Sequence, residues 1–194
     1  MTTTAQSQAR RRVPWTSLVG AGIRVRIARR IKLLSNLDYW AANAAAIQRA
    51  QLRKLLTRAA STEFGRSHDF GKLAALGDDQ IVPAYRKAVP IADWYAYKDL
   101  IARMREGAEP DILWPGLIRD FAQTSGTTAG DKYIPVSKAM MRSNYLASLD
   151  IFANLSRFGI PLSRVTAGRC LFLGGSSDCP VSDKGIRTGD LSGL

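Results

Sequence analysis

The sequence is poor in the residues that build disulfide frameworks and metal sites. It contains two cysteines, Cys170 and Cys179, and one histidine, His68. This composition excludes a disulfide-rich secreted protein and predicts no metal-ligating residues. Apolar runs are short too, because none approaches the length of about 18 residues that a membrane-spanning helix needs. We therefore expect a protein of the reducing cytoplasm, without a membrane span.

Acidic residues are almost absent from the N-terminal third. Residues 1–60 hold 12 Lys/Arg and one acid, Asp38, so most of the net charge of +12 lies at this end. Such a segment could bind nucleic acid or an anionic membrane surface, and a basic binding module is one alternative function. No helix-turn-helix, zinc-finger or aromatic RNA-binding motif accompanies the charge. That favours a disordered basic leader over residues 1–16, followed by solvated helix faces, with no nucleic-acid partner.

The rest of the chain has enough apolar sequence for one core, since 46% of all residues are hydrophobic. Apolar residues at helical spacing predict helices over residues 17–34 and 43–60. One face of the second helix carries four apolar residues: Leu52, Leu55, Leu56 and Ala59. We expect this face to pack in the core.

Prolines and a capping residue divide the next segment. Pro83 and Pro90 bracket a stretch that we expect to be extended. Asp93 is a suitable cap for a helix from Trp94 to Glu106, and Gly107 should end it. Trp94 is interpreted as a packing residue.

The C-terminal part follows a different pattern. We expect a strand over 117–124, a glycine-bearing loop, a long helix capped by Ser137 and running to about residue 158, and a strand over 169–173. The long helix has an apolar stripe that we expect in the core: Tyr145, Leu149 and Phe152. The chain thus divides into a helical lead-in, 17–116, and a strand–loop–helix–strand segment, 117–194, which indicates the α/β class.

The loop, Thr124–Lys132, is the part richest in chemistry. It combines flexible glycines, hydroxyls and one cation: Gly126, Gly130, Ser125, Thr127, Thr128 and Lys132. Backbone N–H groups on glycines, hydroxyl donors and a positive charge together suit a polyphosphate. The Walker pattern G-x-x-x-x-G-K-[ST] is absent, because Asp131 stands where its lysine would be. From the residues alone, an ordinary surface turn remains the alternative.

This loop resembles the T-S-G-T-T-G-x-x-K phosphate loop of the adenylate-forming superfamily. Several other stretches, in the same order along the chain, resemble the auxin-responsive (Gretchen Hagen) acyl-acid amido synthetases. They are Glu63–Arg66, Val89–Ile91, Asp111–Leu113, Tyr133–Ser137 and Gly168–Ser177.

Enzymes of this family join a carboxylic acid to ATP, release pyrophosphate, and pass the acyl group from the adenylate to the amine of an amino acid. The resemblance therefore implies ATP and Mg²⁺ as cofactors, and a small carboxylic acid and an amino acid as partners. It implies Lys132 as the catalytic residue. It also implies a set of phosphate-binding residues: Thr124, Ser125, Gly126, Thr127, Thr128 and Gly130. A ligase that delivers the acyl group to coenzyme A is the alternative within this class.

The family's proteins are several hundred residues long. The resemblance thus implies an N-terminal fragment, with an incomplete N-terminal part of an adenylate-forming (acyl-activating) domain that is inactive alone. Two origins are open: a truncated gene, or one half of a split gene whose partner is a separately encoded C-terminal portion. Arg187–Leu191 is similar to the ribose-binding T-G-D of the superfamily, but it lies much closer to the phosphate loop than is usual. We therefore expect Asp190 to be a turn or cap residue, and His68 to be a surface or helix-end residue.

Overall fold

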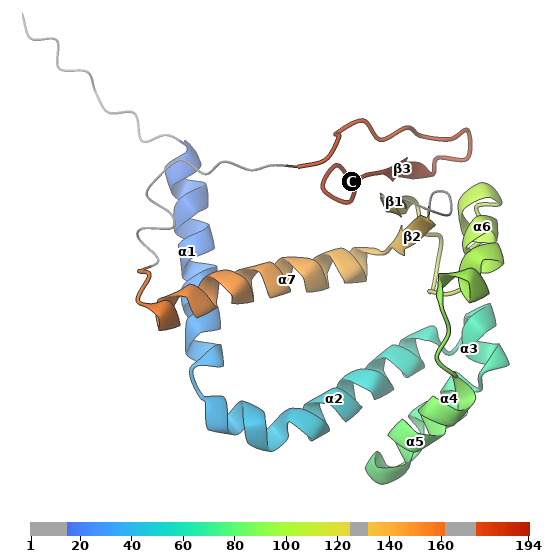
Figure 1. The fold of residues 1–194 in the computed structure, drawn as a ribbon, viewed down its shortest axis with the longest axis horizontal. Helices are drawn as coiled ribbons and strands as arrows, with labels where there is room; N and C mark the ends of the chain where they lie inside the picture. Colours follow the sequence, from blue (N-terminus) through green and yellow to red (C-terminus); the bar gives the residue numbers. More distant parts are fainter. Residues whose placement is uncertain (1–14, 125–131, 162–173) are drawn as a thin grey trace, which may run out of the picture. The chain divides into compact units, whose positions relative to one another are not determined.

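The computed structural model describes residues 15–124, 132–161 and 174–194 (Figure 1). The chain divides into two compact units, one formed by residues 1–36 and 145–170 and the other by residues 37–144 and 171–194. The strand expected over 169–173, with Cys170, and the leader up to residue 14 lie outside the described residues. The last two residues assigned to that leader, Trp15 and Thr16, belong to a helix.

The first unit pairs two helical segments. α1 (Trp15–Leu34) confirms the helix predicted over 17–34. It packs against the part of α7 (Lys138–Leu155) from Tyr145 onward, which η2 (Ser156–Phe158) continues. Three buried residues form the core of this unit: Ile27, Leu149 and Ala153.

The apolar stripe expected on α7 is only partly buried. Leu149 is 6% exposed, whereas Tyr145 and Phe152 are each 42% exposed. The buried residues Leu149 and Ala153 are one helical turn apart, so the contact with Ile27 covers a narrower face than the sequence suggested. At the edge of this contact, Arg26 Nη1 donates a hydrogen bond to the Tyr145 hydroxyl (2.6 Å).

The second unit begins with four helices: α2 (Leu37–Ala59), α3 (Glu63–Ser67), α4 (Phe70–Ala74) and α5 (Asp78–Ala88). Their buried core consists of Leu56, Ala59, Phe70, Leu73 and Ile81. α2 confirms the helix predicted over 43–60 but starts earlier, at Leu37. Leu55, predicted on its buried face, is 43% exposed.

The segment expected to be extended around Pro83 is instead helical. Pro83 lies inside α5 and has no N–H to donate to the preceding turn. Ile81 of the same helix is 0% exposed and packs in the four-helix core. Burial of this face by tertiary packing outweighs the lost hydrogen bond, which a local reading of the proline could not show.

The helix predicted after Asp93 is confirmed, with an irregular start. η1 (Trp94–Tyr97) leads into α6 (Lys98–Glu106), and Gly107 follows as expected. Asp93 Oδ1 accepts a hydrogen bond from Tyr95 N (3.0 Å), as its predicted capping role requires.

A small sheet completes the unit, with strand order β2-β1-β3 (Figure 1). β1 (Asp120–Thr124) begins three residues later than expected. β2 (Lys132–Val136) and β3 (Arg187–Gly189) were not predicted as strands. β2 contains Pro135, which is tolerated because β2 is an edge strand. β3 is only three residues long and pairs parallel with β1. A segment this short has no alternating pattern from which a strand could be predicted.

The sheet packs against α6 through one buried cluster: Ile101, Met104, Ile112, Ile118, Phe121 and Ile186. After β2, Ser137 caps α7 as predicted, because Met140 N donates to Ser137 Oγ (3.1 Å). Together the helices and the small mixed sheet fit the predicted α/β class. Within the described residues, no helix is both long and apolar enough to cross a membrane.

Candidate functional site

The predicted phosphate loop joins the two strands of an antiparallel hairpin. β1 and β2 pair in register from Asp120↔Val136 to Thr124↔Lys132. The two ends of the loop are therefore cross-strand neighbours, and the exposed Thr124 and the half-buried Lys132 mark its entry and exit. The remaining predicted site residues lie outside the described ranges: Ser125, Gly126, Thr127, Thr128 and Gly130. Their contact with phosphate stays a prediction.

The side chain of Lys132 lies against two aromatic rings. Its Nζ is 4.9 Å from the centroid of the Tyr95 ring and 5.9 Å from that of Trp94. The face of an aromatic ring attracts a cation at these distances. The ammonium group is thus held at the first residue of β2, beside the strand end where the loop closes.

The aromatic pair is itself fixed to the hairpin. Trp94 Nε1 donates a hydrogen bond to the carbonyl oxygen of Tyr133 (3.1 Å), the residue after Lys132. The Arg105 guanidinium lies 3.7 Å from the centroid of the Tyr133 ring. Trp94 packs at the edge of the sheet core, as predicted, but its contact with Lys132 was not predicted. The contact between Tyr95 and Lys132 was not predicted either. The sequence around Tyr95 indicates only that it follows the capping residue Asp93.

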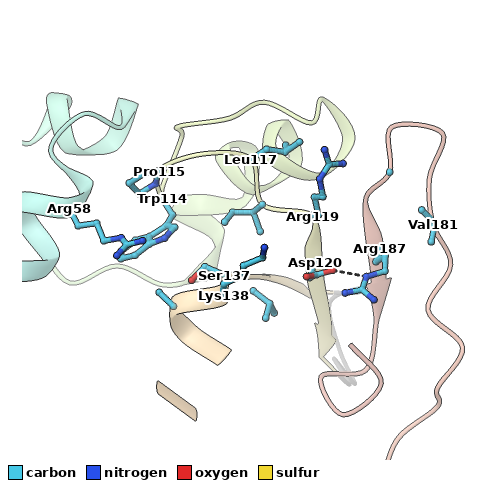
Figure 2. Close-up of a pocket in the computed structure, with 14 residues that line it drawn as sticks. Arg58, Trp114, Pro115, Leu117, Arg119, Asp120, Ser137, Lys138, Val181 and Arg187 are labelled. Carbon is cyan, nitrogen blue, oxygen red and sulfur yellow. Dashed lines mark hydrogen bonds and ion pairs between the residues drawn. The ribbon is translucent and has the colours of Figure 1, made fainter. Parts of the chain in front are cut away.

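The opposite end of the hairpin opens on a pocket of about 680 Å³ (Figure 2). Its lining includes Trp114, Asp120 at the start of β1, and Lys138 at the start of α7. Arg187 Nε donates to Asp120 Oδ1 (2.7 Å), and this contact raises the pKa of Arg187. The hairpin therefore links two distinct regions, the loop at one end and this pocket at the other.

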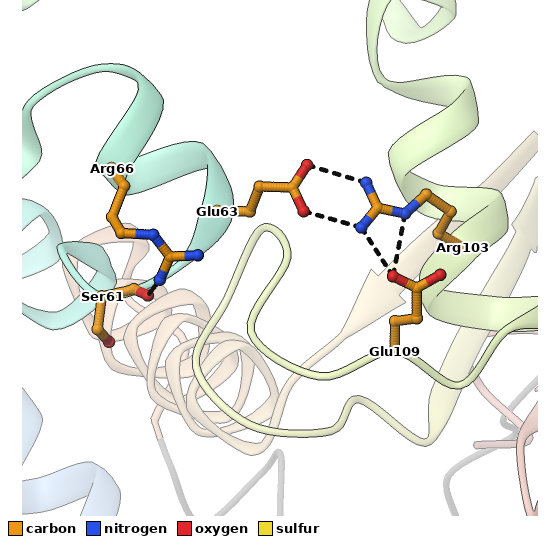
Figure 3. A network of polar contacts seen from close by, with 5 residues as sticks. All are labelled: Ser61, Glu63, Arg66, Arg103 and Glu109. Carbon is orange, nitrogen blue, oxygen red and sulfur yellow. Dashed lines mark hydrogen bonds and ion pairs between the residues drawn. The ribbon is translucent and has the colours of Figure 1, made fainter.

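A charged cluster joins the first family motif to α6 (Figure 3). Arg103 donates two hydrogen bonds to the Glu63 carboxylate (2.9 and 2.8 Å) and also contacts Glu109 Oε2 (2.7 Å). Hydrogen bonding to Arg103 lowers the pKa of Glu63, while the two carboxylates raise the pKa of Arg103. Fork-like pairing of this kind also fixes geometry, so the cluster holds α3 and α6 together.

The motif around Glu63 builds a tight helix junction. Thr62 is 0% exposed, and its Oγ1 donates to Ala59 O (2.7 Å) and accepts from Gly65 N (2.9 Å). Glu63 N donates to Asp111 O (2.7 Å), which brings two motif stretches together that are far apart in sequence. These residues therefore act in positioning and stability.

The Glu63 pairing gives the stability a pH dependence. Because the folded-state pKa of Glu63 is below its ordinary value of 4.5, the pairing stabilises the fold above that pH and is lost as pH falls through the lowered pKa. Thermal unfolding of the parent and of Glu63→Gln should differ at about pH 7, with the variant melting at a lower temperature, and the difference should shrink as the pH falls below 4.5 and through the lowered pKa of Glu63. An unchanged difference between the two proteins over this pH range would contradict this account.

Two further residues have local structural roles. Asp190 Oδ2 accepts a hydrogen bond from Ser176 N (2.8 Å), which agrees with the turn role expected for it. His68 caps the C-terminal end of α3, and its ring centroid lies 4.0 Å from that of Phe64.

Cys179 is free and lies in an irregular segment. In the described ranges, no group of three or more His, Cys, Asp or Glu side chains is arranged to hold a metal ion.

Comparison with known proteins identifies the family. A profile of the GH3 family N-terminal domain matches residues 33–194. The chain is similar to probable indole-3-acetic acid-amido synthetase GH3.7 of Oryza sativa subsp. japonica, with 34% identity over 100 residues, or 50% of this chain and 16% of that protein. It is also similar to probable indole-3-acetic acid-amido synthetase GH3.13 of the same organism, with 28% identity over 120 residues, or 60% of this chain and 26% of that protein.

A third relative, probable indole-3-acetic acid-amido synthetase GH3.1 of Oryza sativa subsp. japonica, is 29% identical over 118 residues, or 60% of this chain and 18% of that protein. The matched part of the chain thus spans between 16% and 26% of the length of these relatives. The profile match covers most of the chain, including the α3 junction and the hairpin. The chain belongs to the GH3 family, as the ordered motifs predicted, and residues 33–194 correspond to the N-terminal domain of that family.

Proposed function

We propose that this chain supplies the nucleotide-phosphate-binding hairpin of an ATP-dependent acyl-acid amido synthetase. In the proposed reaction, a carboxylate attacks the α-phosphorus of ATP and pyrophosphate leaves. The amine of an amino acid then attacks the acyl carbon, and AMP leaves. Membership of the GH3 family and the similarity to proteins named amido synthetases support this reaction, and they favour an amine over the thiol of coenzyme A as the acceptor.

The observation that carries the proposal is the placement of Lys132. Its ammonium group lies on the faces of Tyr95 and Trp94, at the strand end that faces Thr124 across the hairpin. A cation fixed beside the loop can stabilise the negative charge that builds on the departing pyrophosphate without first having to reorganise. The two aromatic rings hold the ammonium group in place, because each ring face attracts the positive charge and restricts the flexible lysine side chain.

The described residues at the hairpin end fit a polyphosphate. Lys132 offers an ammonium donor, and Thr124 is an exposed hydroxyl residue directly across from it. Both donor types bind phosphate oxygens. Mg²⁺ bound together with the nucleotide would supply positive charge that offsets the charge of the phosphates.

Replacing Lys132 by alanine should weaken binding of Mg·ATP to the full chain by about tenfold or more, since a charge-assisted contact to phosphate is lost. Isothermal titration calorimetry measures the change. Lys54→Ala is a matched control, because Lys54 is an exposed residue of α2 outside the hairpin, and this variant should bind like the parent.

A second variant tests the aromatic contribution separately. Tyr95→Leu keeps the lysine but removes the nearer ring, so binding should weaken by a few-fold, about the worth of one exposed cation–π contact. Circular dichroism confirms that each variant is folded. Equal affinities of the parent and Lys132→Ala for Mg·ATP, or no measurable binding by the parent, would refute the proposal.

A further inference from the structure

Most of the net charge of the chain lies in the first unit. Residues 1–36 and 145–170 together hold 11 Lys/Arg and one acid, whereas the rest of the chain holds 17 Lys/Arg and 15 acids. The first unit therefore carries +10 of the net charge of +12. A charge of one sign gathered in one small unit indicates an anionic partner, because an anionic surface relieves the repulsion among the cations.

The basic helix of this unit lies largely outside the family match. The GH3 profile matches residues 33–194, whereas α1 runs from Trp15 to Leu34 (Figure 1). α1 contains five Lys/Arg and no acid, and all five precede residue 33. The part of the chain that corresponds to the GH3 domain therefore does not account for this charge.

α1 has one face in the core of the unit and one in solvent. Ile27 is 1% exposed, and Ile31 and Leu34 pack against the same cluster. Residues two positions from Ile27 point nearly the opposite way, because an α-helix turns by about 100° per residue. We call that opposite side the outward face of α1, and its residues are all exposed: Val25, Arg29, Lys32 and Leu33.

The cations of α1 differ in whether an acid pairs with them. Arg30 Nη2 donates to Asp150 Oδ2 (2.6 Å), and Asp150 is the one acid in the sequence of this unit. The others have no carboxylate to pair with there. Within the ranges that the structure describes, three exposed cations of α1 form no ion pair: Arg24, Arg29 and Lys32. These three are available to an external anion.

Apolar side chains are exposed among these cations. Val25 is 52% exposed and Leu33 is 48% exposed, on the face that also carries Arg29 and Lys32. A nucleic-acid backbone binds through its phosphates, so it would leave the two aliphatic side chains in water. At a lipid bilayer they enter the boundary between head groups and acyl chains, while the long Lys and Arg side chains reach the lipid phosphates. The mixture of cations and aliphatic groups therefore favours lipid over nucleic acid.

We propose that the outward face of α1 binds the anionic surface of a lipid bilayer. Arg24, Arg29 and Lys32 pair with acidic head groups, and Val25 and Leu33 enter the shallow apolar boundary beneath them. The helix lies on the membrane and does not cross it. This interaction is additional to the proposed nucleotide-binding hairpin of the second unit and does not depend on that function.

Cosedimentation of the full chain with lipid vesicles tests the proposal. One set of vesicles contains phosphatidylcholine alone, and the other contains about 30% phosphatidylserine as the anionic lipid. The chain should bind the anionic vesicles at least about tenfold more tightly, because only they attract the cations of α1. Equal binding to the two kinds of vesicle, or no binding to either, would overturn the proposal.

Charge variants locate the binding on α1. The triple variant Arg24→Gln, Arg29→Gln and Lys32→Gln should bind anionic vesicles about 100-fold more weakly, since each Lys or Arg near an anionic bilayer strengthens binding by about fivefold. A control variant removes the same number of charges from exposed positions of α2 and α5: Lys54→Gln, Arg86→Gln and Lys87→Gln. The control should bind like the parent. If both triple variants lose binding equally, binding follows the total charge and not α1.

Apolar variants distinguish a bilayer from a purely charged surface. Val25→Gln together with Leu33→Gln keeps every charge and should weaken vesicle binding by about tenfold, because apolar area no longer enters the bilayer. The control pair, Leu55→Gln and Ile91→Gln, changes exposed apolar residues of the second unit and should leave binding unchanged. Undiminished binding by the Val25 and Leu33 variant would contradict the proposed insertion. Circular dichroism of each variant shows whether it is folded.

A competition experiment decides between lipid and nucleic acid. A short DNA duplex is added to the chain and anionic vesicles, with DNA phosphate and anionic lipid at equal concentrations. The chain should stay on the vesicles, because DNA offers no apolar boundary to Val25 and Leu33. Release of more than half of the bound chain would show that nucleic acid is the better partner and would overturn the proposal.

Discussion

Truncating Phe121 to alanine should lower the free energy of unfolding by about 4 kcal/mol, because the large buried ring leaves a cavity that its neighbours fill only in part. Phe121 is 0% exposed and lies at the centre of the buried cluster between β1 and α6. Urea denaturation followed by circular dichroism measures the change. A loss of this size removes a large fraction of the stability of a small domain.

A milder substitution keeps the test valid if the alanine variant does not fold. Phe121→Leu nearly conserves volume and should cost about 1–1.5 kcal/mol. Phe158→Ala is the control for aromatic truncation as such, because Phe158 is 78% exposed, and its effect should stay within about 0.5 kcal/mol. Similar losses for Phe121→Ala and Phe158→Ala would show that the cluster around Phe121 does not stabilise the fold.

Lost packing at Phe121 should also affect the candidate site, because Phe121 lies in the strand that leads to the predicted phosphate loop. Phe121 is in β1, three residues before Thr124, where the predicted phosphate loop begins. Amide hydrogen exchange should therefore be faster in β1 and β2 of Phe121→Leu than in the parent, since local opening follows lost packing. Unchanged exchange in both strands would show that the hairpin is held independently of this core.

Adding a single methyl group at Gly65 should lower the free energy of unfolding by about 3 kcal/mol, because it would overpack a junction with no free space. A Cβ at this position would lie 1.9 Å from the carbonyl oxygen of Ala59 and 3.0 Å from Thr62 Oγ1. The backbone would have to move, and the movement would break the hydrogen bond from Gly65 N to Thr62 Oγ1 (2.9 Å). Thr62 would then remain buried with its capping bond lost.

Gly71→Ala is the matched control. Gly71 lies in α4, where the nearest atom to an added Cβ is the Ala60 Cβ at 4.0 Å. In a helix with free space, alanine should be neutral or stabilising by up to about 1 kcal/mol. Thermal melting of the two variants distinguishes them, and a Gly65→Ala protein as stable as Gly71→Ala would disprove the close approach.

Local features were predicted well because their causes lie within a few neighbouring residues. Asp93 and Ser137 each cap the helix expected of them, since a cap needs only its own side chain and an N–H two or three residues ahead. The helix over 43–60 was predicted from its apolar spacing and its many alanines, and α2 confirms it. The wrong prediction at Pro83 arose where a local rule competed with burial, because Ile81 binds α5 to a core that the neighbouring sequence does not reveal.

Several short motifs in a fixed order predicted the family from the sequence, and the expected order of helices followed by strand, loop, helix and strand predicted the α/β class. The sequence did not predict that β2 and β3 are strands, that Tyr95 and Trp94 contact Lys132, or that Arg58 and Lys138 line one pocket. These features join residues that lie far apart along the chain. The pairing of Asp120 with Arg187, for example, joins residues 67 positions apart. Such contacts depend on how the whole unit packs, and no local pattern encodes them.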